Sequence, residues 1–392
     1  MTVDAELPAG PPGIDAPRLA SWLGQALPDA GRITAVELIA GGRSNLTYRI
    51  GLTGGGAGVS GGPEAGLTGR ADGKAGLHRI PDRNLGDLSG AERSIVLRRP
   101  PLGHVLPTAH DMAREHRVLS ALAARGAVPV PRPLAFCADE TVIGARFYLM
   151  EYVEGRVLRT VEDAVDVSPA QARELSERLA EALAAIHLLD VEEAGLSDFG
   201  RPAGYLARQL TRWGQQWERS KTRESPECGR LAERLGSRLP ADGRAGLVHG
   251  DFRLDNALTR LTPRTEIAAV VDWEMSTLGD PLTDLGLTLV YWADAGDEER
   301  LRIPVGSTVT SAPGFLTRRE FAARYAELTG FDLADLDFYV AFASYKLAVI
   351  LEGIHARFLQ KATVGEGFEE IGESVPVLID RAHRVLDGRS PW

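Results

Sequence analysis

The sequence of 392 residues has only two cysteines, and no uninterrupted apolar run approaches the ~20 residues needed to cross a bilayer. The cysteines, Cys137 and Cys228, lie far apart, and neither has a second cysteine or a histidine at ligand spacing. This pattern argues against a structural zinc site. The N-terminal stretch MTVDAELPAGPPG has acidic residues near its start and no apolar core, unlike a secretory signal peptide. We therefore expect a cytoplasmic protein with no membrane partner.

The chain also lacks an excess of positive charge. Its 44 Lys and Arg residues are outnumbered by 54 Asp and Glu residues, which gives a formal net charge of -10. Nucleic-acid binding depends on a concentrated basic surface, so nucleic acid is not expected as a partner. The composition, 44% hydrophobic and 25% charged, is typical of globular proteins, and the length is sufficient for one large domain or two lobes.

The order of the expected elements divides the chain into three regions. Residues 1–32 are predicted to form an N-terminal extension with one short helix. Residues 33–150 contain β-rich runs and are predicted to form a small lobe. This lobe is interrupted at 51–93 by a flexible insertion that is rich in glycine. Residues 151–392 have mostly helical periodicity, so we expect an α+β protein with a small β-rich N-lobe and a larger, mainly helical C-lobe.

The pattern of apolar residues predicts several individual elements. A short strand is expected at 94–98, and the predicted helices include 111–124, 168–187, 203–219 and 335–358. The second of these helices has a clear start signal. Ser168 is placed as the N-cap, a proline follows at the first helical position, and Gln171 is placed to complete a capping box.

The most informative segment is LVHGDFRLDN, residues 247–256. An apolar strand leads into His249 and Gly250, which are followed by Asp251 and, five residues later, by Asn256. Phosphoryl transfer to a hydroxyl needs a carboxylate that orients the attacking oxygen and accepts its proton. It also needs oxygen ligands for the Mg²⁺ that binds the nucleotide phosphates. The kinase catalytic loop has this Asp-to-Asn spacing, and we expect the histidine to brace the loop through hydrogen bonds.

A second acidic site follows in VVDWE, residues 270–274. Asp272 ends an apolar β-run, which is the expected place for the principal ligand of Mg²⁺, since this ion prefers hard oxygen donors. Arg253, two residues after Asp251, could stabilise charge on the transferring phosphoryl group. A lone aspartate after a strand is usually a cap or turn residue, but the combination of HGD, an Asn at plus five and a strand-terminal DWE is rare by chance.

HGDFRLDN followed by VVDWEMSTLGDPLTDLG resembles the aminoglycoside phosphotransferase and choline-kinase-like superfamily. The runs YLARQLTRWGQQWERS and VLRRPPLG are similar to a branch that includes the kinase-like domains linked to acyl-CoA dehydrogenases. The resemblance covers the chain from about residue 33 onward, apart from the insertion, and implies a protein-kinase-like bilobal fold. It implies Asp251 as catalytic base, Asn256 and Asp272 as Mg²⁺ ligands, and ATP or GTP as phosphoryl donor. Asp284, in GDPLTDLG, matches a family position expected to anchor the catalytic loop.

A kinase-like small lobe needs a phosphate-binding loop and a basic residue on a strand. The loop is predicted at the turn of the first hairpin, where four residues could contact phosphate: Gly41, Gly42, Ser44 and Asn45. The protein-kinase pattern GxGxxG is absent there. Arg98 falls where the superfamily commonly has lysine. The arginine preserves the positive charge, but its guanidinium is a planar fork and not a point charge like the lysine ammonium.

Two further features support a nucleotide site in the small lobe. Glu115 lies on the apolar stripe of its predicted helix, where an unpaired carboxylate is costly. Pairing with Arg98, as in the Lys–Glu ion pair of the family, would remove that cost. The strand that ends in MEYVEG resembles a kinase hinge, in which the Glu151 carbonyl and the Val153 amide would bind the edge of the adenine ring.

These features predict a Mg²⁺-dependent phosphotransferase that moves the γ-phosphate of ATP or GTP to a hydroxyl of a small molecule. Aromatic residues of the C-lobe could line the acceptor cavity, although aromatics at helical spacing are more often core. They are Trp213, Trp217, Tyr291, Trp292, Phe338, Tyr339, Phe342 and Tyr345. The resemblance makes a hydroxylated acyl compound a reasonable acceptor. The alternative function is a nucleotide-binding pseudokinase or scaffold module without turnover, and the departure at Arg98 is the one feature that favours it.

Overall fold

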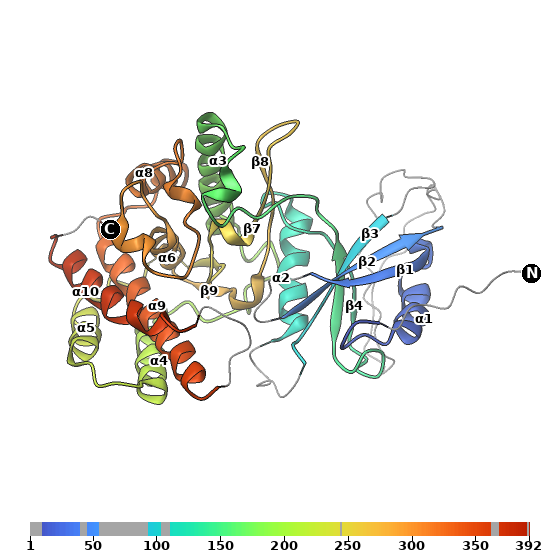
Figure 1. Cartoon of the computed structure of the whole chain (residues 1–392), viewed down its shortest axis with the longest axis horizontal. Coiled ribbons are helices and arrows are strands. Elements are labelled where there is room, and N and C mark those ends of the chain that lie inside the picture. Colours follow the sequence, from blue (N-terminus) through green and yellow to red (C-terminus); the bar gives the residue numbers. More distant parts are fainter. Residues whose placement is uncertain are drawn as a thin grey trace, which may run out of the picture. The chain divides into compact units, whose positions relative to one another are not determined.

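The computed structural model describes residues 10–39, 45–54, 93–102, 110–243, 245–361, 368–389 and 392 (Figure 1). Gly41, Gly42 and Ser44 of the predicted phosphate loop, and nearly all of the glycine-rich insertion, lie outside these residues. The chain divides into two units. Unit 1 comprises Met1–Ala124 and Pro131–Val153, and unit 2 comprises Arg125–Val130 and Glu154–Trp392. Unit 1 is built around a sheet and unit 2 is mostly helical, so the predicted α+β class is confirmed.

Unit 1 contains one antiparallel sheet of five strands in the order β1-β2-β3-β5-β4. The strands are β1 (Arg32–Leu38), β2 (Leu46–Thr53), β3 (Arg93–Arg99), β4 (Pro133–Cys137) and β5 (Phe147–Glu151). β3 lies in the middle and pairs with β2 and β5, with Leu97 opposite Tyr48 on one side and Leu149 on the other. The predicted strand at 94–98 is therefore the central strand of the sheet.

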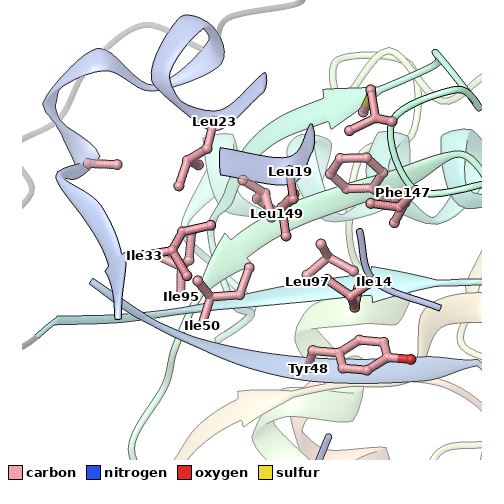
Figure 2. Close-up of a cluster of buried hydrophobic side chains, with 14 of the residues drawn as sticks. Ile14, Leu19, Leu23, Ile33, Tyr48, Ile50, Ile95, Leu97, Phe147 and Leu149 are labelled. Carbon is pink, nitrogen blue, oxygen red and sulfur yellow. The ribbon is translucent and has the colours of Figure 1, made fainter. Parts of the chain in front are cut away.

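One face of the sheet is covered by helix α1 (Ala16–Ala26). Figure 2 shows Leu19 and Leu23 of this helix against side chains from the strands, including Leu97 and Phe147. Asp15 caps the helix by accepting a hydrogen bond from the main-chain N–H of Arg18. Residues that the sequence analysis set apart as an extension thus supply part of the hydrophobic core of unit 1.

The opposite face of the sheet is covered by α2 (Met112–Arg125). Alternation along a strand points successive side chains to opposite faces. Phe147 and Leu149 therefore join the core on the α1 side, whereas the ring of Tyr148 between them lies 5.8 Å from that of His116 on α2. The same alternation on β3 directs Arg98 towards α2.

Most of the α-helices of the structure belong to unit 2. They are α3 (Pro169–His187), α4 (Tyr205–Ser220), α5 (Pro226–Gly236), α6 (Leu282–Tyr291), α7 (Glu298–Leu301), α8 (Arg318–Thr329), α9 (Leu336–Leu359) and α10 (Ser374–Leu386). The start predicted for α3 is confirmed. Ser168 accepts from the N–H of Gln171, whose side chain accepts in return from the N–H of Ser168, and Pro169 occupies the first turn.

Helix α9 lies in the core of unit 2. Within the described part of the chain it is the one helix long and apolar enough to cross a bilayer, and 78% of its most apolar window is buried inside the protein. It contacts α4, α5, α6 and α10. A helix that is apolar on all sides and surrounded by other helices is a core helix.

Two short antiparallel ribbons complete unit 2. β6 (Gly246–Val248) pairs with β9 (Thr277–Gly279), and β7 (Ala257–Arg260) pairs with β8 (Glu266–Val270). Val248 leads into the HGD motif, and Val270 leads into the DWE motif. The register of the second ribbon places Ala257 opposite Val270. The pairing therefore brings the end of the loop that carries the HGD motif beside the start of the loop that carries the DWE motif.

Candidate active site

The loop that carries Asp251 turns sharply at Gly250. This glycine has φ of +88°, a left-handed conformation that residues with a Cβ rarely adopt. A Cβ built there would lie 2.7 Å from the carbonyl oxygen of Met275. Met275 belongs to the 3-10 turn η4 (Trp273–Met275) of the second acidic motif. The two motifs are thus in direct backbone contact, and only glycine permits that approach.

Asp284 anchors this loop from the first turn of α6. Its Oδ2 accepts from the N–H of His249 at 2.6 Å, and its Oδ1 accepts from the N–H of Gly250 at 2.8 Å. The carboxylate is 1% exposed and also contacts His187 Nε2 at 3.3 Å. Burial alone would raise the pKa of Asp284, but the hydrogen bond and charge of His187 and the N–H of Gly250 lower it. The expected anchoring role is confirmed.

His249 braces the loop instead of facing a substrate. Its ring is fully buried and lies 4.6 Å from the ring of Trp273, measured between centroids. Nδ1 accepts from the main-chain N–H of Asp251 at 3.3 Å, so the ring proton resides on Nε2, which donates to the carbonyl of Val271 at 3.0 Å. The histidine therefore ties the main chain of Asp251 to that of Val271, the residue before Asp272.

The side chain of Asp251 is held by its neighbours on the loop. Asn256 Nδ2 donates to the main-chain oxygen of Asp251 at 2.8 Å and to its Oδ2 at 3.0 Å. Arg253 Nε lies 3.5 Å from the same Oδ2. Because the amide nitrogen of Asn256 is directed to Asp251, the amide oxygen is the atom with which Asn256 could bind a metal.

Asp272 has a left-handed backbone, with φ of 69° and ψ of 56°. This conformation is uncommon for a residue with a side chain, and such strain concentrates at functional sites. The preceding residue, Val271, donates its N–H to the main-chain oxygen of Asn256 at 2.9 Å. Burial disfavours the charge of Arg253, but Asp251, Tyr291, Asp255 and Asp272 together raise its pKa. The positive charge of Arg253 thus interacts with carboxylates of both acidic loops.

The donor set of these loops fits Mg²⁺. In the described residues no group of three or more His, Cys, Asp and Glu side chains is arranged to hold a metal. Mg²⁺ in nucleotide sites does not need one, since one or two protein oxygens are completed by phosphates and water. The amide oxygen of Asn256 and the carboxylate of Asp272 are hard donors of this kind, on loops joined through Val271.

The nucleotide-related residues of unit 1 that the structure describes also come together. Arg98 Nε lies 2.8 Å from Glu115 Oε1, and the glutamate side chain is 2% exposed. Asn45 Nδ2 donates to Glu115 Oε2 at 3.4 Å, and Asn45 Oδ1 lies 2.8 Å from His110 Nδ1. Burial, followed by the charge of Arg98, lowers the pKa of His110. The ion pair expected from the buried stripe is present, and His110 is a member of this cluster that the sequence analysis missed.

The predicted hinge residues lie at the end of unit 1. Glu151 is the last residue of β5, and its N–H donates to the carbonyl of Arg132 at 2.9 Å. Val153 is the last residue of unit 1. Their assignment to adenine binding stays a prediction.

Two residues beside Asp251 were not predicted from sequence to contact the catalytic loop, although Tyr291 was considered for an acceptor cavity. The hydroxyl of Tyr291, at the end of α6, forms a hydrogen bond with Asp251. Burial, followed by the negative charge of Asp251, raises the pKa of Tyr291, so the hydroxyl is the donor. Lys346 on α9 donates from Nζ to the carbonyl of Gly250 at 2.8 Å. A lone lysine in an otherwise apolar stretch of helix was the available signal.

Most of the aromatic residues considered for an acceptor cavity belong to the core of unit 2. Those that are buried are Trp213, Trp217, Trp292, Phe338, Tyr339, Phe342 and Tyr345. Tyr291 is partly exposed beside Asp251. Trp213 is also close to the catalytic loop, since its ring centroid lies 5.7 Å from Lys346 Nζ.

Comparison with known proteins identifies the family. Residues 86–339 match the family described as Phosphotransferase enzyme family (APH). Acyl-CoA dehydrogenase family member 11 of Rattus norvegicus is 37% identical over 69% of this chain, which spans 35% of that protein. The chain covers about a third of the length of such curated relatives.

Solved structures agree with this assignment. A candidate aminoglycoside phosphotransferase from Ralstonia eutropha JMP134 has a TM-score of 0.72 and 29% identity, covering 96% of this chain and 100% of its own. The GDP complex of aminoglycoside 2'-phosphotransferase-IIIa has a TM-score of 0.55 and 16% identity, covering 95% and 99%, a likeness of fold alone. The predicted protein-kinase-like fold is confirmed, and the chain belongs to the phosphotransferase enzyme family.

Proposed function

We propose that the protein transfers the γ-phosphate of ATP or GTP to a hydroxyl group of a small molecule, in the presence of Mg²⁺. The observation that supports this most strongly is the joining of the two acidic loops. His249 and Asn256 both bond to Val271, and Gly250 packs against Met275. A proton acceptor and a metal-binding carboxylate are thereby held on one rigid backbone framework.

In this proposal Asp251 is the catalytic base. It accepts the proton of the acceptor hydroxyl while that oxygen forms a bond to the γ-phosphorus. The bond from the γ-phosphorus to the bridging oxygen breaks, and ADP or GDP leaves. Asn256, Arg253 and Tyr291 hold the carboxylate of Asp251 in one orientation. Arg253 also carries positive charge that can stabilise the transferring phosphoryl group.

Asn256 and Asp272 would hold Mg²⁺ through their side-chain oxygens. A bound Mg²⁺ would neutralise charge on the nucleotide phosphates. Fixing the amide nitrogen of Asn256 on Asp251 leaves its oxygen oriented for that contact. The left-handed backbone at Asp272 is compatible with a position maintained for function.

Nucleotide binding is assigned to unit 1. Arg98, oriented by Glu115, would contact the phosphates together with Asn45 and the loop residues Gly41, Gly42 and Ser44. Main-chain groups of Glu151 and Val153 would bind the base. The acceptor is a hydroxylated small molecule, and the names of the curated relatives make hydroxylated acyl compounds the first class to test. A cytoplasmic location is part of the same proposal.

A pseudokinase without turnover is the second candidate, and Arg98 in place of the usual lysine is the observation that favours it. A thermal-shift experiment with ATP, with and without Mg²⁺, combined with a phosphorylation screen of hydroxylated metabolites read by mass, separates the two. Mg²⁺-dependent stabilisation with a mass gain of the acceptor supports the phosphotransferase. Metal-independent stabilisation with no transfer supports the pseudokinase.

A further inference from the structure

A partly buried cation approaches the catalytic loop from a different element. Lys346 belongs to α9, whose neighbouring residues are apolar, and its Nζ donates to the carbonyl oxygen of Gly250 at 2.8 Å. The Gly250 carbonyl is part of the peptide that leads into Asp251. Lys346 therefore contacts the catalytic loop from the core helix of unit 2, on the main chain immediately before the proposed base.

A lysine at this position needs an explanation. Burial lowers the pKa of Lys346, while the charges of Asp251 and Asp284 favour its protonated form. A neutral side-chain donor could bond to the same carbonyl, and its desolvation would cost less free energy than that of an ammonium group. Retaining the cation makes physical sense if its charge acts on the carboxylates of the loop.

Charges of both signs lie around Asp251, and Asp255, Asp272 and Asp284 are the negative ones. Arg253 Nε lies 3.5 Å from the carboxylate, and Lys346 acts on it from the side of α9. Arg212 on α4 is close enough to lower the pKa of Lys346, and its guanidinium carbon lies 5.6 Å from the ring centroid of Trp213. Asp255 provides an opposing negative charge, at 3.7 Å from Arg253 Nη1.

We propose that Lys346 is a positioning residue that fixes the Gly250 peptide and thereby Asp251. This proposal rests on the proposed phosphotransferase function.

The experiment compares Lys346→Met, which removes the charge and the donor, with Lys346→Arg, which retains both. Lys346→Gln serves as a second neutral variant if the methionine variant does not fold. Lys221→Met is the matched control, because Lys221 lies outside the proposed catalytic and nucleotide residues and pairs with Glu218 and Glu224. Asp251→Asn is included as the test of the proposed function itself.

The proposal predicts that either neutral variant lowers kcat at least about tenfold, leaves the dissociation constant of Mg-ATP within about twofold, and unfolds near the temperature of the parent. Amide hydrogen exchange of the loop peptide at 249–256 should accelerate in these variants, independently of activity. Lys346→Arg should recover part of the loss.

Three results decide the matter. Parent-like kcat and exchange rates in the neutral variants, with Asp251→Asn inactive, would overturn the role of Lys346 alone. An equal loss of kcat in Lys346→Arg and Lys346→Met would overturn the need for a cationic donor at this position. If Asp251→Asn retains parent activity, the proposed function is wrong, and loop exchange in the Lys346 variants then still reports whether the lysine holds the loop.

Discussion

Val271 accepts a hydrogen bond from the ring of His249 and donates one to the main chain of Asn256, at 3.0 and 2.9 Å. These two bonds connect the motif that carries the proposed base with the motif that carries the proposed metal ligand. The sequence suggested both motifs separately. Their connection is the geometric basis for treating them as one site.

Replacing the proposed base should separate chemistry from binding. Asp251→Asn is expected to lower turnover by roughly 10²–10⁴-fold, because proton transfer to a positioned carboxylate contributes about that much. Mg-ATP affinity, measured by a fluorescent analogue, should change little. Asp380→Asn, an exposed carboxylate on α10, is the control. Undiminished turnover in the Asp251 variant would remove this residue from the mechanism.

Removing the metal ligand should act differently. Asp272→Asn is expected to raise the Mg²⁺ concentration for half-maximal activity by at least about tenfold. Even residues that only support a metal ligand typically cost that much metal affinity when they are replaced. Chelation by EDTA should abolish turnover, and added Mg²⁺ should restore it. An unchanged Mg²⁺ dependence in the variant would exclude Asp272 as a ligand.

Asp284 should contribute to stability in a pH-dependent way. The pKa of Asp284 is lowered in the folded state. Its contribution to the free energy of unfolding is therefore fully present above the pKa of the unfolded state, about 3.9, and is lost as the pH falls through the pKa of the folded state. Asp284→Asn should therefore reduce the unfolding free energy at neutral pH by roughly 1–3 kcal/mol. The difference from the parent should shrink in urea titrations below about pH 4. A difference that stays constant down to pH 2 would contradict this linkage.

Gly250→Ala tests the close approach of the two loops. The substitution places a Cβ against the carbonyl of Met275 in a backbone conformation that alanine disfavours, with an expected cost of about 1–3 kcal/mol. Gly296→Ala is the matched control, since it also has positive φ, +82°, but meets no atom within 4 Å. A similar loss in both variants would assign the cost to φ alone and not to the contact.

The Arg98–Glu115 pair can be measured by a double-mutant cycle. Glu115→Gln leaves a largely buried guanidinium without its carboxylate and should lower the unfolding free energy by roughly 3 kcal/mol and weaken nucleotide binding. Arg98→Met combined with Glu115→Gln should lose less than the sum of the single variants. Strict additivity would show that the pair contributes no coupling.

Local signals predicted much of the fold and part of the site. The cap at Ser168 fixed the start of α3, and the carboxylate on the apolar stripe of α2 predicted its partner on β3. Lys346 was missed because α9 is apolar on almost all sides, so the contact of one lysine depends on tertiary packing alone. The core position of α1 was missed for a related reason, since an amphipathic helix does not reveal the surface on which it packs.

The sheet core of unit 1 also sets a practical limit on where the protein can be divided. The family match begins at residue 86, after β2 and before β3, and ends at residue 339, near the start of α9. A fragment cut at these two points would lose α1, β1 and β2 and would leave the apolar side of Leu97 and Phe147 exposed to water. It would also lose most of α9, including Lys346. The stretch of sequence that matches the family is therefore shorter than the segment that is able to fold.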